Sequence, residues 1–362
     1  MANKMSVKAK TVLVGMSGGV DSSAAAALLL QQDYRVIGVA MKTWAEGEDM
    51  GVGGRACFSP EREKDIEQAR RVAAILSIPF HVIDLSEQFK ASVLDYFCRG
   101  YLAGRTPNPC VRCNRLVKFG ALWEESRRLG LDFDYFATGH YARVECDADS
   151  GRYLLKRGLD GRKDQSYFLY GLTQDQLVLT LFPLGKMHKS EARELCRSLG
   201  LGSEGREESQ DFAGGRYTSL FTRHPGPGKL VDAQGRVLGQ HRGIIYYTPG
   251  QRHGLGLAAK EPLYVIEIRA EANEVVVGRK EALLKPEQTV GELNWIALPG
   301  LEGEREVRAR IRSTHAGYSA TISPLEGGRI RVVYTEPRPV AARGQSIVFY
   351  EGDTVIGGGI AL

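Results

Sequence analysis

Between residue 8 and about residue 140, short apolar runs alternate with amphipathic segments. The strand candidates are Lys10–Val14, Arg35–Met41, Phe80–Asp84 and Tyr135–Thr138. Apolar residues at helical spacing predict helices over Pro60–Ser77, Glu87–Tyr101 and Leu116–Leu129. This alternation is typical of an α/β domain with a parallel sheet flanked by helices.

The pattern of apolar and polar residues changes after residue 145. Helices are predicted near 173–181 and 188–199, and short alternating strands follow from Lys229 onward. Those strands are Leu230-Val231, Val237-Leu238, Ile244–Tyr247, Tyr264–Ile268, Glu274–Val277 and, near the end, Ile347–Tyr350. We therefore expect three domains: an α/β domain over 1–205, a small central β-containing domain over 206–282 and a C-terminal β-barrel over 283–362.

The most informative stretch is GMSGGVDSS at 15–23, which lies between the first predicted strand and an Ala/Leu-rich helix. Its glycines permit close backbone approach, and the N–H groups at a helix start attract an anion such as phosphate. Asp21 is suited to hold magnesium or to position the helix start. The competing reading is a glycine-rich turn with a helix cap.

No Gly-Lys-Ser/Thr triplet occurs in the chain, so the loop is not that of the common kinases and GTPases. It resembles instead the loop of the ATP pyrophosphatase (PP-loop) superfamily, which has the adenine nucleotide alpha hydrolase-like fold. This resemblance implies cleavage of ATP between the α and β phosphates, with AMP transferred to a substrate oxygen.

Ligands of a parallel sheet bind beyond the carboxyl ends of its strands. Three segments should meet there: 15–23, Met41–Trp44 and Thr138–His140. Met41 is suited to pack on adenine or to belong to the core, and Gly139 would let a ribose approach the backbone. His140 is a candidate donor to phosphate or RNA and equally a structural residue. The glycine-rich stretch Gly47–Phe58 reads either as a loop over this site or as flexibility without function.

A second informative stretch, TPNPCVRCN at 106–114, places Cys110 and Cys113 three residues apart. Its two prolines predict an extended loop, with both cysteines just upstream of the helix that starts at Leu116. A helix start and nearby Arg112, Arg115 and Lys118 should lower a thiol pKa. Zinc, a thioredoxin-type pair and chance spacing compete with a reactive thiol site or an iron-sulfur cluster completed by Cys57, Cys98 or Cys196.

Composition and charge limit the classes of protein to which this chain can belong. The chain has 362 residues, 25% charged residues and a formal net charge of +5, which permits a polyanionic partner without requiring one. Six scattered cysteines do not form a secreted disulfide framework. Met1–Lys10 lacks an apolar signal segment, and no apolar run is long enough for a bilayer, so we expect a cytoplasmic protein without membrane contact.

Residues 307–312 alternate strictly between apolar residues and arginine. On a strand, this pattern places Arg308, Arg310 and Arg312 on one face, a geometry suited to RNA phosphates. A solvated strand face without a ligand is the competing reading.

Five collinear stretches together resemble the bacterial tRNA-specific 2-thiouridylase family. They are residues 15–23, the 104–114 segment with Lys118–Gly120, Ala137–Tyr141, Lys163–Tyr167 and Gly344–Ser346. The resemblance spans nearly the whole chain. It implies an enzyme that binds ATP and the anticodon stem-loop of tRNA, adenylates the C2 oxygen of the wobble uridine and replaces that oxygen with sulfur from a protein persulfide or sulfide.

The same resemblance implies residue roles. ATP with Mg²⁺ would be bound by Gly15, Met16, Ser17, Gly18, Gly19, Val20, Asp21 and Ser22, with Met41 and Gly139 beside it. Asn108, Pro109 and Cys110 would contact the target base, and Cys113 would be the nucleophile. The tRNA would also be contacted by His140, Lys163, Asp164, Gln165, Arg310, Ile311 and Gln345.

One departure from the family pattern is chemically important. The family has a second catalytic cysteine, which carries a persulfide, where this chain has Ala213. Cys110 could replace it, or Cys110, Cys113 and a third cysteine could hold an iron-sulfur cluster with one iron free to bind sulfide. Two other functions compete: a non-catalytic tRNA-binding homologue and an adenylating, amide-forming synthetase of the same superfamily.

Overall fold

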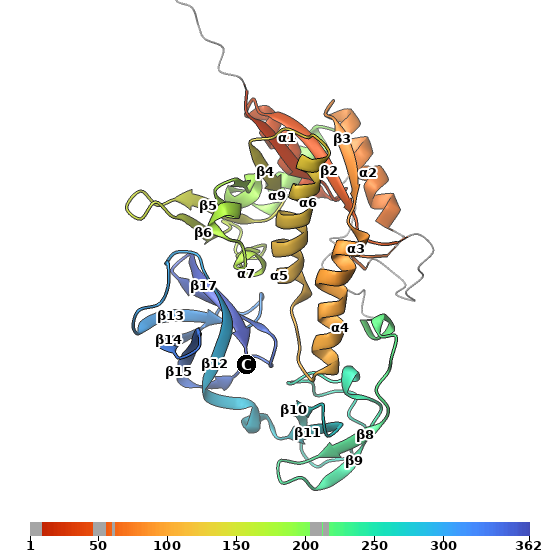
Figure 1. Cartoon of the computed structure of the whole chain (residues 1–362), viewed down its shortest axis with the longest axis vertical. Helices are drawn as coiled ribbons and strands as arrows, with labels where there is room; N and C mark the ends of the chain where they lie inside the picture. The colour runs from red at the N-terminus through yellow and green to blue at the C-terminus, as the bar shows by residue number, and fades with distance from the viewer. Residues whose placement is uncertain (1–8, 46–55, 60–61, 203–211, 213–216) are drawn as a thin grey trace, which may run out of the picture.

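The computed structural model describes residues 9–45, 56–59, 62–202, 212 and 217–362 (Figure 1). Its N-terminal part contains a parallel sheet with the strand order β3-β2-β1-β4-β7. The strands are β1 (Thr11–Gly15), β2 (Arg35–Lys42), β3 (Phe80–Asp84), β4 (Tyr135–Thr138) and β7 (Thr180–Leu181). The four predicted strands are therefore present. β7 is an addition, because the segment predicted as a helix over 173–181 is helical only in α8 (Gln174–Leu177).

Helices pack on this sheet because its strands are apolar on both faces. Val12, Leu13 and Val14 of β1 are all fully buried. On one side lie α1 (Val20–Gln31), α2 (Glu63–Ile75) and α9 (Lys189–Ser198). The alanines of α1 are buried almost completely, which lets α1 lie close to both the sheet and α9.

Two long helical columns extend from the sheet toward the other domains (Figure 1). One consists of α3 (Ser86–Phe89), the π-helical turn η2 (Lys90–Leu94) and α4 (Asp95–Leu102). The other consists of α5 (Pro109–Cys113), the π-helical η3 (Asn114–Ala121) and α6 (Leu122–Arg128). Within the described ranges, no helix is long and apolar enough to cross a membrane.

The second column corrects a prediction, because its helix begins at Pro109 and not at Leu116. Proline is tolerated at the first helical position, where its missing N–H would have no intrahelical partner. Asn108 caps this helix by accepting the Val111 N–H at 3.3 Å. The extended loop therefore ends at Asn108, and both cysteines lie inside the helix.

The central domain is a four-stranded sheet in the order β10-β11-β8-β9. Its strands are β8 (Gly228–Val231), β9 (Val237–His241), β10 (Tyr264–Arg269) and β11 (Glu274–Gly278). The strand predicted at Ile244–Tyr247 is wrong: η6 (Ile244–Tyr246) is a 3₁₀ turn that follows Gly243, whose φ is +135°. Phe97 and Tyr101 of α4 share the apolar core of this domain.

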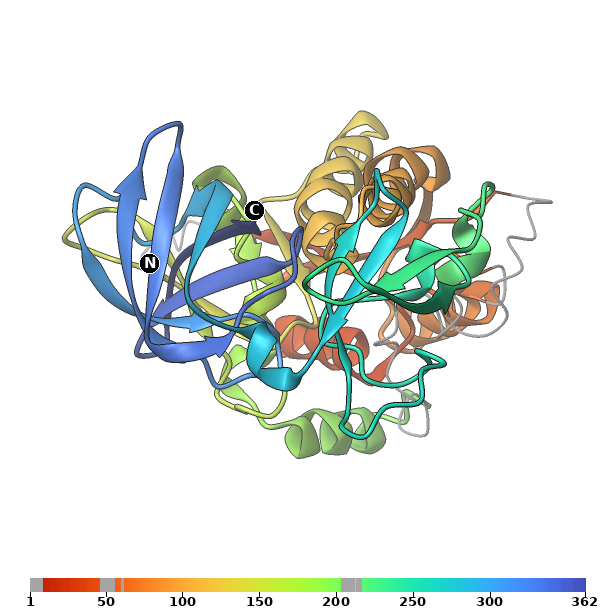
Figure 2. The ribbon, with the colours of Figure 1, turned by 90° about the horizontal axis from the view of Figure 1, so that it is seen from below.

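The C-terminal domain is a closed barrel of six strands, because β12 pairs with both β15 and β17. The strands are β12 (Leu284–Trp295), β13 (Arg305–Arg310), β14 (Tyr318–Leu325), β15 (Arg329–Pro339), β16 (Ser346–Glu351) and β17 (Thr354–Ala361). Seen from below, the barrel and the central domain lie next to each other (Figure 2).

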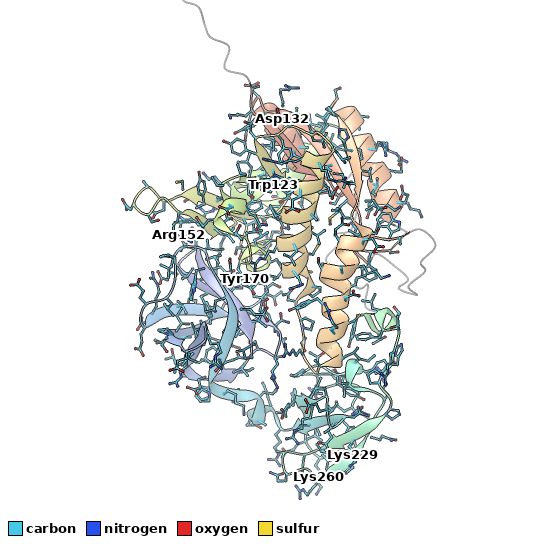
Figure 3. All side chains as sticks on the ribbon, viewed as in Figure 1. Trp123, Asp132, Arg152, Tyr170, Lys229 and Lys260 are labelled. Atoms are coloured by element: carbon cyan, nitrogen blue, oxygen red, sulfur yellow. The ribbon has the colours of Figure 1, made fainter. Side chains whose placement is uncertain are left out.

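The N-terminal domain also contributes to the barrel sheet. The hairpin of β5 (Ala142–Cys146) and β6 (Tyr153–Arg157) joins it through the pairing of Thr354 with Lys156. Arg152 of this hairpin, labelled in Figure 3, donates from Nε to the Ile296 carbonyl at 2.8 Å. The domains are thus connected by backbone pairing as well as by side chains.

Candidate functional site

The loop between β1 and α1 is held by its own serines. The Ser17 N–H donates to Ser22 Oγ at 3.1 Å. The Ser22 and Ser23 hydroxyls both donate to the Gly19 carbonyl, at 3.2 and 2.9 Å. Gly19 is the N-cap residue of α1. The serine pair therefore fixes the loop geometry, and Ser17, which is exposed, remains the hydroxyl that faces solvent.

Glycine is required at two points of this site. Gly18 has φ +72°, and a Cβ there would lie 2.3 Å from the Asp65 carbonyl oxygen of α2. At Gly139, a Cβ would lie 2.5 Å from the backbone carbon of Asp21. The close approach expected at Gly139 is therefore an approach to the first turn of α1. Gly139 positions that turn against β4, which sequence alone did not indicate.

Asp21 is held by partners from two distant segments. Lys189 Nζ of α9 donates to its two carboxylate oxygens at 2.7 and 2.8 Å, and the Tyr141 hydroxyl donates to Oδ1 at 2.9 Å. Lys189 is 7% exposed. Of the two roles expected for Asp21, this arrangement matches the positioning of the helix start. Lys189 was missed by sequence reasoning, because no local pattern links it to Asp21.

The two methionines differ in placement. Met16 is 3% exposed and lies in the apolar core formed by α1, α2 and β2, so only its backbone faces the loop. Met41 is half-buried and packs against the core cluster that contains Leu13 and Cys113. The contacts of Met41 in the structure are therefore those of a residue at the edge of the core.

His140 is buried and its ring Nδ1 lies 2.7 Å from Thr138 Oγ1. Its ring packs near Phe119 and Phe182, with centroid distances of 6.2 and 6.0 Å. Burial holds the pKa of His140 well below its usual value, and the charge of Lys118 adds to this shift. A neutral, buried imidazole matches the structural reading of His140.

The start of α5 contacts the barrel through its N-cap residue, Asn108. Asn108 Nδ2 donates to Gln345 Oε1 at 3.3 Å, and the Thr106 N–H donates to the Arg343 carbonyl at 2.7 Å. Asn108 and Gln345 are 237 positions apart. Two residues that the family resemblance assigned to RNA contact are thus neighbours, one from each domain.

The thiol of Cys113 does not have the environment that was expected. Cys113 is 8% exposed and belongs to the core cluster around Val117 and Phe119. Burial raises the pKa of Cys113 to about 11; Lys118 opposes this shift and Cys57 adds to it. The expected lowering of the Cys113 pKa is therefore wrong, because desolvation outweighs the helix start and the neighbouring cation.

The arginine strand also differs from its prediction. Arg308 and Arg312 are exposed, but Arg310 is 6% exposed, and β13 ends at Arg310. Arg310 Nη1 forms an ion pair with Asp164 Oδ2 at 2.7 Å, and the Asp164 side chain is 3% exposed. Ile311 is also buried. The single arginine face is thus interrupted, because Arg310 turns inward to neutralise a buried carboxylate.

The residues around Asp164 join the N-terminal domain to the barrel. The Tyr141 N–H donates to Gln165 Oε1 at 3.0 Å, while Lys163 is half-buried. Tyr170, labelled in Figure 3, donates to Ser346 Oγ at 3.2 Å and to the Gly359 carbonyl at 3.3 Å. This segment therefore contacts the barrel through Asp164 and Tyr170.

The remaining cysteines lie in separate places. Cys196 is buried against α1 and its thiol contacts the Val20 carbonyl at 3.4 Å, whereas Cys98 contacts the Leu220 carbonyl at 3.6 Å. Cys57 packs against the cluster that contains Cys113. Among the residues that the structure describes, no three His, Cys, Asp or Glu side chains are grouped so as to hold a metal ion. Ala213 and most of the stretch Gly47–Phe58 lie outside the described residues.

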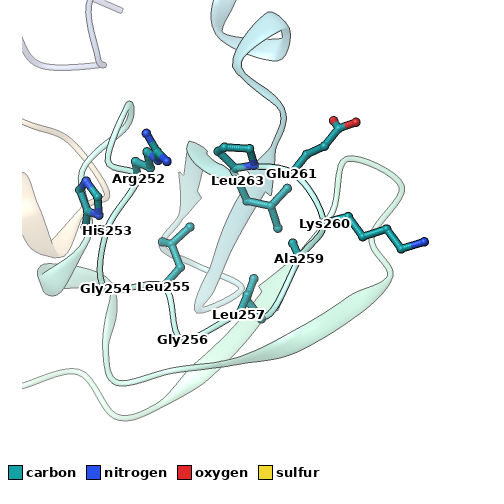
Figure 4. Close-up of a pocket in the computed structure, with 11 residues that line it drawn as sticks. Arg252, His253, Gly254, Leu255, Gly256, Leu257, Ala259, Lys260, Glu261 and Leu263 are labelled. Atoms are coloured by element: carbon teal, nitrogen blue, oxygen red, sulfur yellow. The ribbon is translucent and has the colours of Figure 1, made fainter.

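A separate hollow lies in the central domain, in the loop before β10 (Figure 4). It has a volume of about 410 Å³ and is lined by residues that include Arg252, His253, Leu255, Leu257, Lys260 and Leu263. None of the residues predicted from the sequence lies there. The predicted site instead follows the carboxyl ends of β1 and β4 and the start of α5.

Comparison with known proteins covers nearly the whole chain. Family models match as "tRNA methyl transferase HUP domain" over residues 10–213, "tRNA methyl transferase PRC-barrel domain" over 221–279 and "Aminomethyltransferase beta-barrel domain" over 286–361. Two curated relatives are named "tRNA-specific 2-thiouridylase MnmA". The relative from Clostridium botulinum (strain Alaska E43 / Type E3) is 45% identical over 365 residues, which is 98% of this chain and 99% of the relative. The relative from Moorella thermoacetica (strain ATCC 39073 / JCM 9320) is 47% identical over 354 residues, which is 96% and 98%.

Solved structures give weaker likenesses. NMN synthetase from Francisella tularensis matches with a TM-score of 0.32 and 14% identity, covering 59% of this chain and 68% of that one. A predicted subunit of tRNA methyltransferase from Methanocaldococcus jannaschii matches with a TM-score of 0.31 and 18% identity, covering 52% and 74%. The family models and the full-length relatives, however, agree across all three domains, and the chain belongs to the tRNA-specific 2-thiouridylase family.

Proposed function

We propose that this protein uses ATP to adenylate the C2 oxygen of the wobble uridine of a tRNA and then replaces that oxygen with sulfur. The observation that carries this proposal is the match of all three domains, in order, to relatives named tRNA-specific 2-thiouridylase. We further propose the domain limits 1–205, 206–282 and 283–362, with β5 and β6 shared between the first and the last, and a cytoplasmic location.

ATP is proposed to bind at the loop between β1 and α1. Residues Gly15–Ser22 present backbone N–H groups and the Ser17 hydroxyl at the start of α1, where a phosphate is favoured. Asp21 acts by holding this turn in place through Lys189 and Tyr141. Gly139 supports the turn from β4, and Met41 contributes apolar surface beside the sheet end.

The uridine is proposed to bind at the start of α5. The target base must leave its stack in the anticodon loop to reach a reactive group. Asn108, Pro109 and Cys110 form the first turn there, and Cys113 supplies a nucleophilic thiol from the next turn. Gln345 from the barrel lies beside Asn108, so the base pocket is formed by two domains.

Other residues implied in RNA contact divide by exposure. Lys163 and Gln345 are accessible enough to meet tRNA, and we add Arg308 and Arg312 as phosphate contacts. His140, Arg310 and Ile311 are buried, the Asp164 side chain is 3% exposed and paired with Arg310, and Gln165 bonds to Tyr141. We propose that these five residues support the RNA-binding surface without contacting RNA themselves.

Two metal cofactors were expected from the sequence: magnesium at Asp21 and an iron-sulfur cluster at Cys110 and Cys113. Both oxygens of Asp21 are occupied by Lys189, which does not match a magnesium ligand. Cys110 and Cys113 have no third ligand grouped with them in the described part of the chain, which does not match a cluster site. No step of the proposed reaction is therefore routed through either group.

The decisive experiment incubates anaerobically purified protein with ATP, magnesium, unmodified tRNA and a persulfide or sulfide source. Digestion and mass spectrometry then detect 2-thiouridine, and a parallel assay measures pyrophosphate. We expect both products, and pyrophosphate only when tRNA is present. Pyrophosphate release that is indifferent to tRNA would indicate an amide-forming synthetase, and tRNA binding without thionucleoside would indicate a non-catalytic homologue.

A further inference from the structure

The helical pattern of the column that contains Cys113 changes directly after this residue. α5 ends at Cys113, and the π-helical η3 follows over Asn114–Ala121. The pattern is evident at the end of η3, where the Leu122 N–H donates to the Val117 carbonyl, five residues earlier. The extra residue of such a segment rotates α5 relative to α6 by about 100°, the turn made by one residue of an α-helix. η3 therefore determines the side of the column on which Cys113 lies.

The backbone of η3 is bound by one side chain of α8. Gln176 Nε2 donates to the carbonyls of Arg115 and Phe119, at 3.0 and 2.8 Å. These two carbonyls belong to residues four positions apart, which lie on one face of a helix, so a single amide nitrogen reaches both. The amide oxygen of Gln176 accepts the N–H of Thr173, the N-cap residue of α8, at 3.0 Å. Gln176 therefore connects the start of α8 to η3.

The residues on either side of Cys113 are also held by carbonyls of other elements. Asn114 Nδ2 donates to the Phe168 carbonyl at 3.0 Å. Arg112 Nε donates to the Ser92 carbonyl of η2 at 2.6 Å, and its guanidinium carbon lies 4.2 Å from the centre of the Tyr96 ring. α5 is thus attached to the neighbouring helical column, while η3 is attached to the segment that leads to α8. Both attachments oppose rotation of α5 about its axis.

A second glutamine of α8 makes the same kind of contacts in another direction. Gln174 Nε2 donates to the carbonyls of Tyr153 and Ile296, at 2.9 and 3.1 Å, and its amide oxygen accepts the Tyr153 N–H at 2.8 Å. Tyr153 begins β6 and Ile296 follows β12, so neither belongs to the column that contains Cys113. Gln174 and Gln176 are both half-buried. They differ mainly in the element that their amides hold.

We propose that Gln176 is a positioning residue for Cys113, because its amide holds η3 in the π-helical pattern that sets the direction of the thiol. This inference rests on the function proposed above, in which Cys113 is the nucleophile. Gln176 acts through the backbone of η3 and not by contact with substrate. When both donations to η3 are lost, η3 is free to adopt the α-helical pattern. α5 then turns about its axis, and Cys113 leaves the core cluster around Val117 and Phe119.

Three substitutions separate the two functions of the Gln176 amide in the full-length protein. Gln176→Glu keeps an oxygen that accepts the Thr173 N–H but loses both donations to η3. Gln176→Met loses the same donations without adding a charge. Gln176→Lys keeps a donor for the two carbonyls of η3 and loses the acceptor. Gln174→Glu is the matched control, because it removes two donations of the same kind from the same helix. Urea unfolding of each variant shows whether the losses of stability are comparable.

The first readout is the rate at which iodoacetamide labels Cys113 in the folded protein, which requires no activity. We expect Gln176→Glu and Gln176→Met to be labelled about 10-fold faster than the wild type, because the thiol leaves the core. Gln176→Lys and Gln174→Glu should stay within about 2-fold of the wild type. A carboxylate near a thiol disfavours the thiolate, so the charge of Gln176→Glu alone would slow labelling. Wild-type rates in both fast variants, or equally fast labelling of Gln174→Glu, overturn the proposal.

The second readout separates binding from reaction in the assay for 2-thiouridine. We expect Gln176→Met to lower kcat by about 10-fold or more and to leave KM for ATP and for tRNA within about 2-fold of the wild type. A general loss of stability does not produce this division, and Gln174→Glu should change neither constant. An unchanged kcat in Gln176→Met contradicts the role of Gln176. Absence of 2-thiouridine with the wild type would instead refute the proposed function, while the labelling rates would still test whether Gln176 holds η3.

Discussion

Lys189 Nζ donates to both carboxylate oxygens of Asp21, at 2.7 and 2.8 Å, although the two residues are 168 positions apart. The Lys189 side chain is 8% exposed and that of Asp21 is 31% exposed. The pair connects the first turn of α9 to the first turn of α1, beside the proposed phosphate site. Asp21 also favours its own helix start, because a carboxylate there opposes the positive end of the helix dipole.

Lys189→Met should therefore destabilise the protein and slow adenylation. We expect a loss of about 1–2 kcal/mol in the free energy of unfolding, which is below the value for a fully buried pair because Asp21 is partly exposed. Urea unfolding and tRNA-dependent pyrophosphate release measure the two effects. Arg197→Ala is the control on the same helix, since Arg197 and Glu194 form an exposed pair, and it should change stability by less than about 0.5 kcal/mol.

Gly139→Ala should disturb the loop between β1 and α1, where ATP is proposed to bind. The new Cβ would lie 2.5 Å from the Asp21 backbone carbon and 2.7 Å from the Ser22 backbone nitrogen, and backbone atoms cannot move aside as a side chain does. We expect about 1–3 kcal/mol of destabilisation and weaker ATP binding, measured by urea unfolding and calorimetry. Gly161→Ala, where a Cβ would meet nothing within 4 Å, should leave ATP binding unchanged. Equal effects of the two substitutions would refute this role of Gly139.

The Arg310–Asp164 pair should matter for stability more than for RNA affinity. Removing one partner leaves the other charge buried, so Arg310→Leu should cost about 3 kcal/mol or more. Asp164→Leu in the same chain should recover part of that loss, as a double-mutant cycle measures. On the same strand, Arg305→Leu should cost less than about 1 kcal/mol, because its Glu351 partner is partly exposed.

Arg312→Ala, unlike Arg310→Leu, should lower tRNA affinity and leave stability unchanged. Arg312 is exposed just after β13, so its loss should leave the unfolding transition in place. If Arg312 contacts a phosphate, its removal should lower tRNA affinity. The slope of log K against log salt concentration should then become shallower by about 1. Filter binding at several salt concentrations gives this slope. An unchanged slope would remove Arg312 from the RNA surface.

Cys113 should react slowly with alkylating agents in the free protein. Burial raises its pKa to about 11, so the thiolate, which is the reactive form, is scarce at pH 8. The rate of iodoacetamide labelling, followed by peptide mass spectrometry, should keep rising up to about pH 11. Lys118→Met should slow labelling further, because Lys118 lowers the Cys113 pKa. A labelling midpoint near pH 8 would contradict this assignment.

The same shift predicts a pH dependence of stability. Because the folded state holds the Cys113 proton more tightly than the unfolded chain, this group stabilises the fold below pH 9. The contribution is lost as pH rises from 9 toward 11. The wild type should therefore lose more free energy of unfolding over this interval than Cys113→Ala, as urea titrations at each pH would show.

Much of the fold could be predicted because periodicity is a local property. The strands β1 to β4 and the helix α9 follow from apolar spacing in single segments, and the loop between β1 and α1 follows from its glycines and serines. The order of the three domains likewise followed from the change of pattern after residue 145. The start of α5 was missed because proline was treated only as a helix breaker, whereas Asn108 and Pro109 together form a helix start.

The errors in the site have a common physical origin. Arg310 and Cys113 were expected to be accessible and charged, but their burial depends on partners far along the chain, such as Asp164 and Phe119. The contact of Lys189 with Asp21 and the need for glycine at Gly139 are likewise tertiary. The local sequence does not show which side chains will be desolvated by residues that are distant in the chain.

The pairing of Thr354 with Lys156 has a consequence for dissection of the chain. A protein cut at the start of the barrel would leave the outer edge of the β5–β6 hairpin without its neighbour, and unpaired edges recruit strands from other molecules. The amino-terminal fragment should therefore self-associate when expressed alone. A shared sheet of this kind also restricts movement of the barrel relative to the N-terminal domain, so the proposed tRNA contacts of the two domains would keep a fixed relative position.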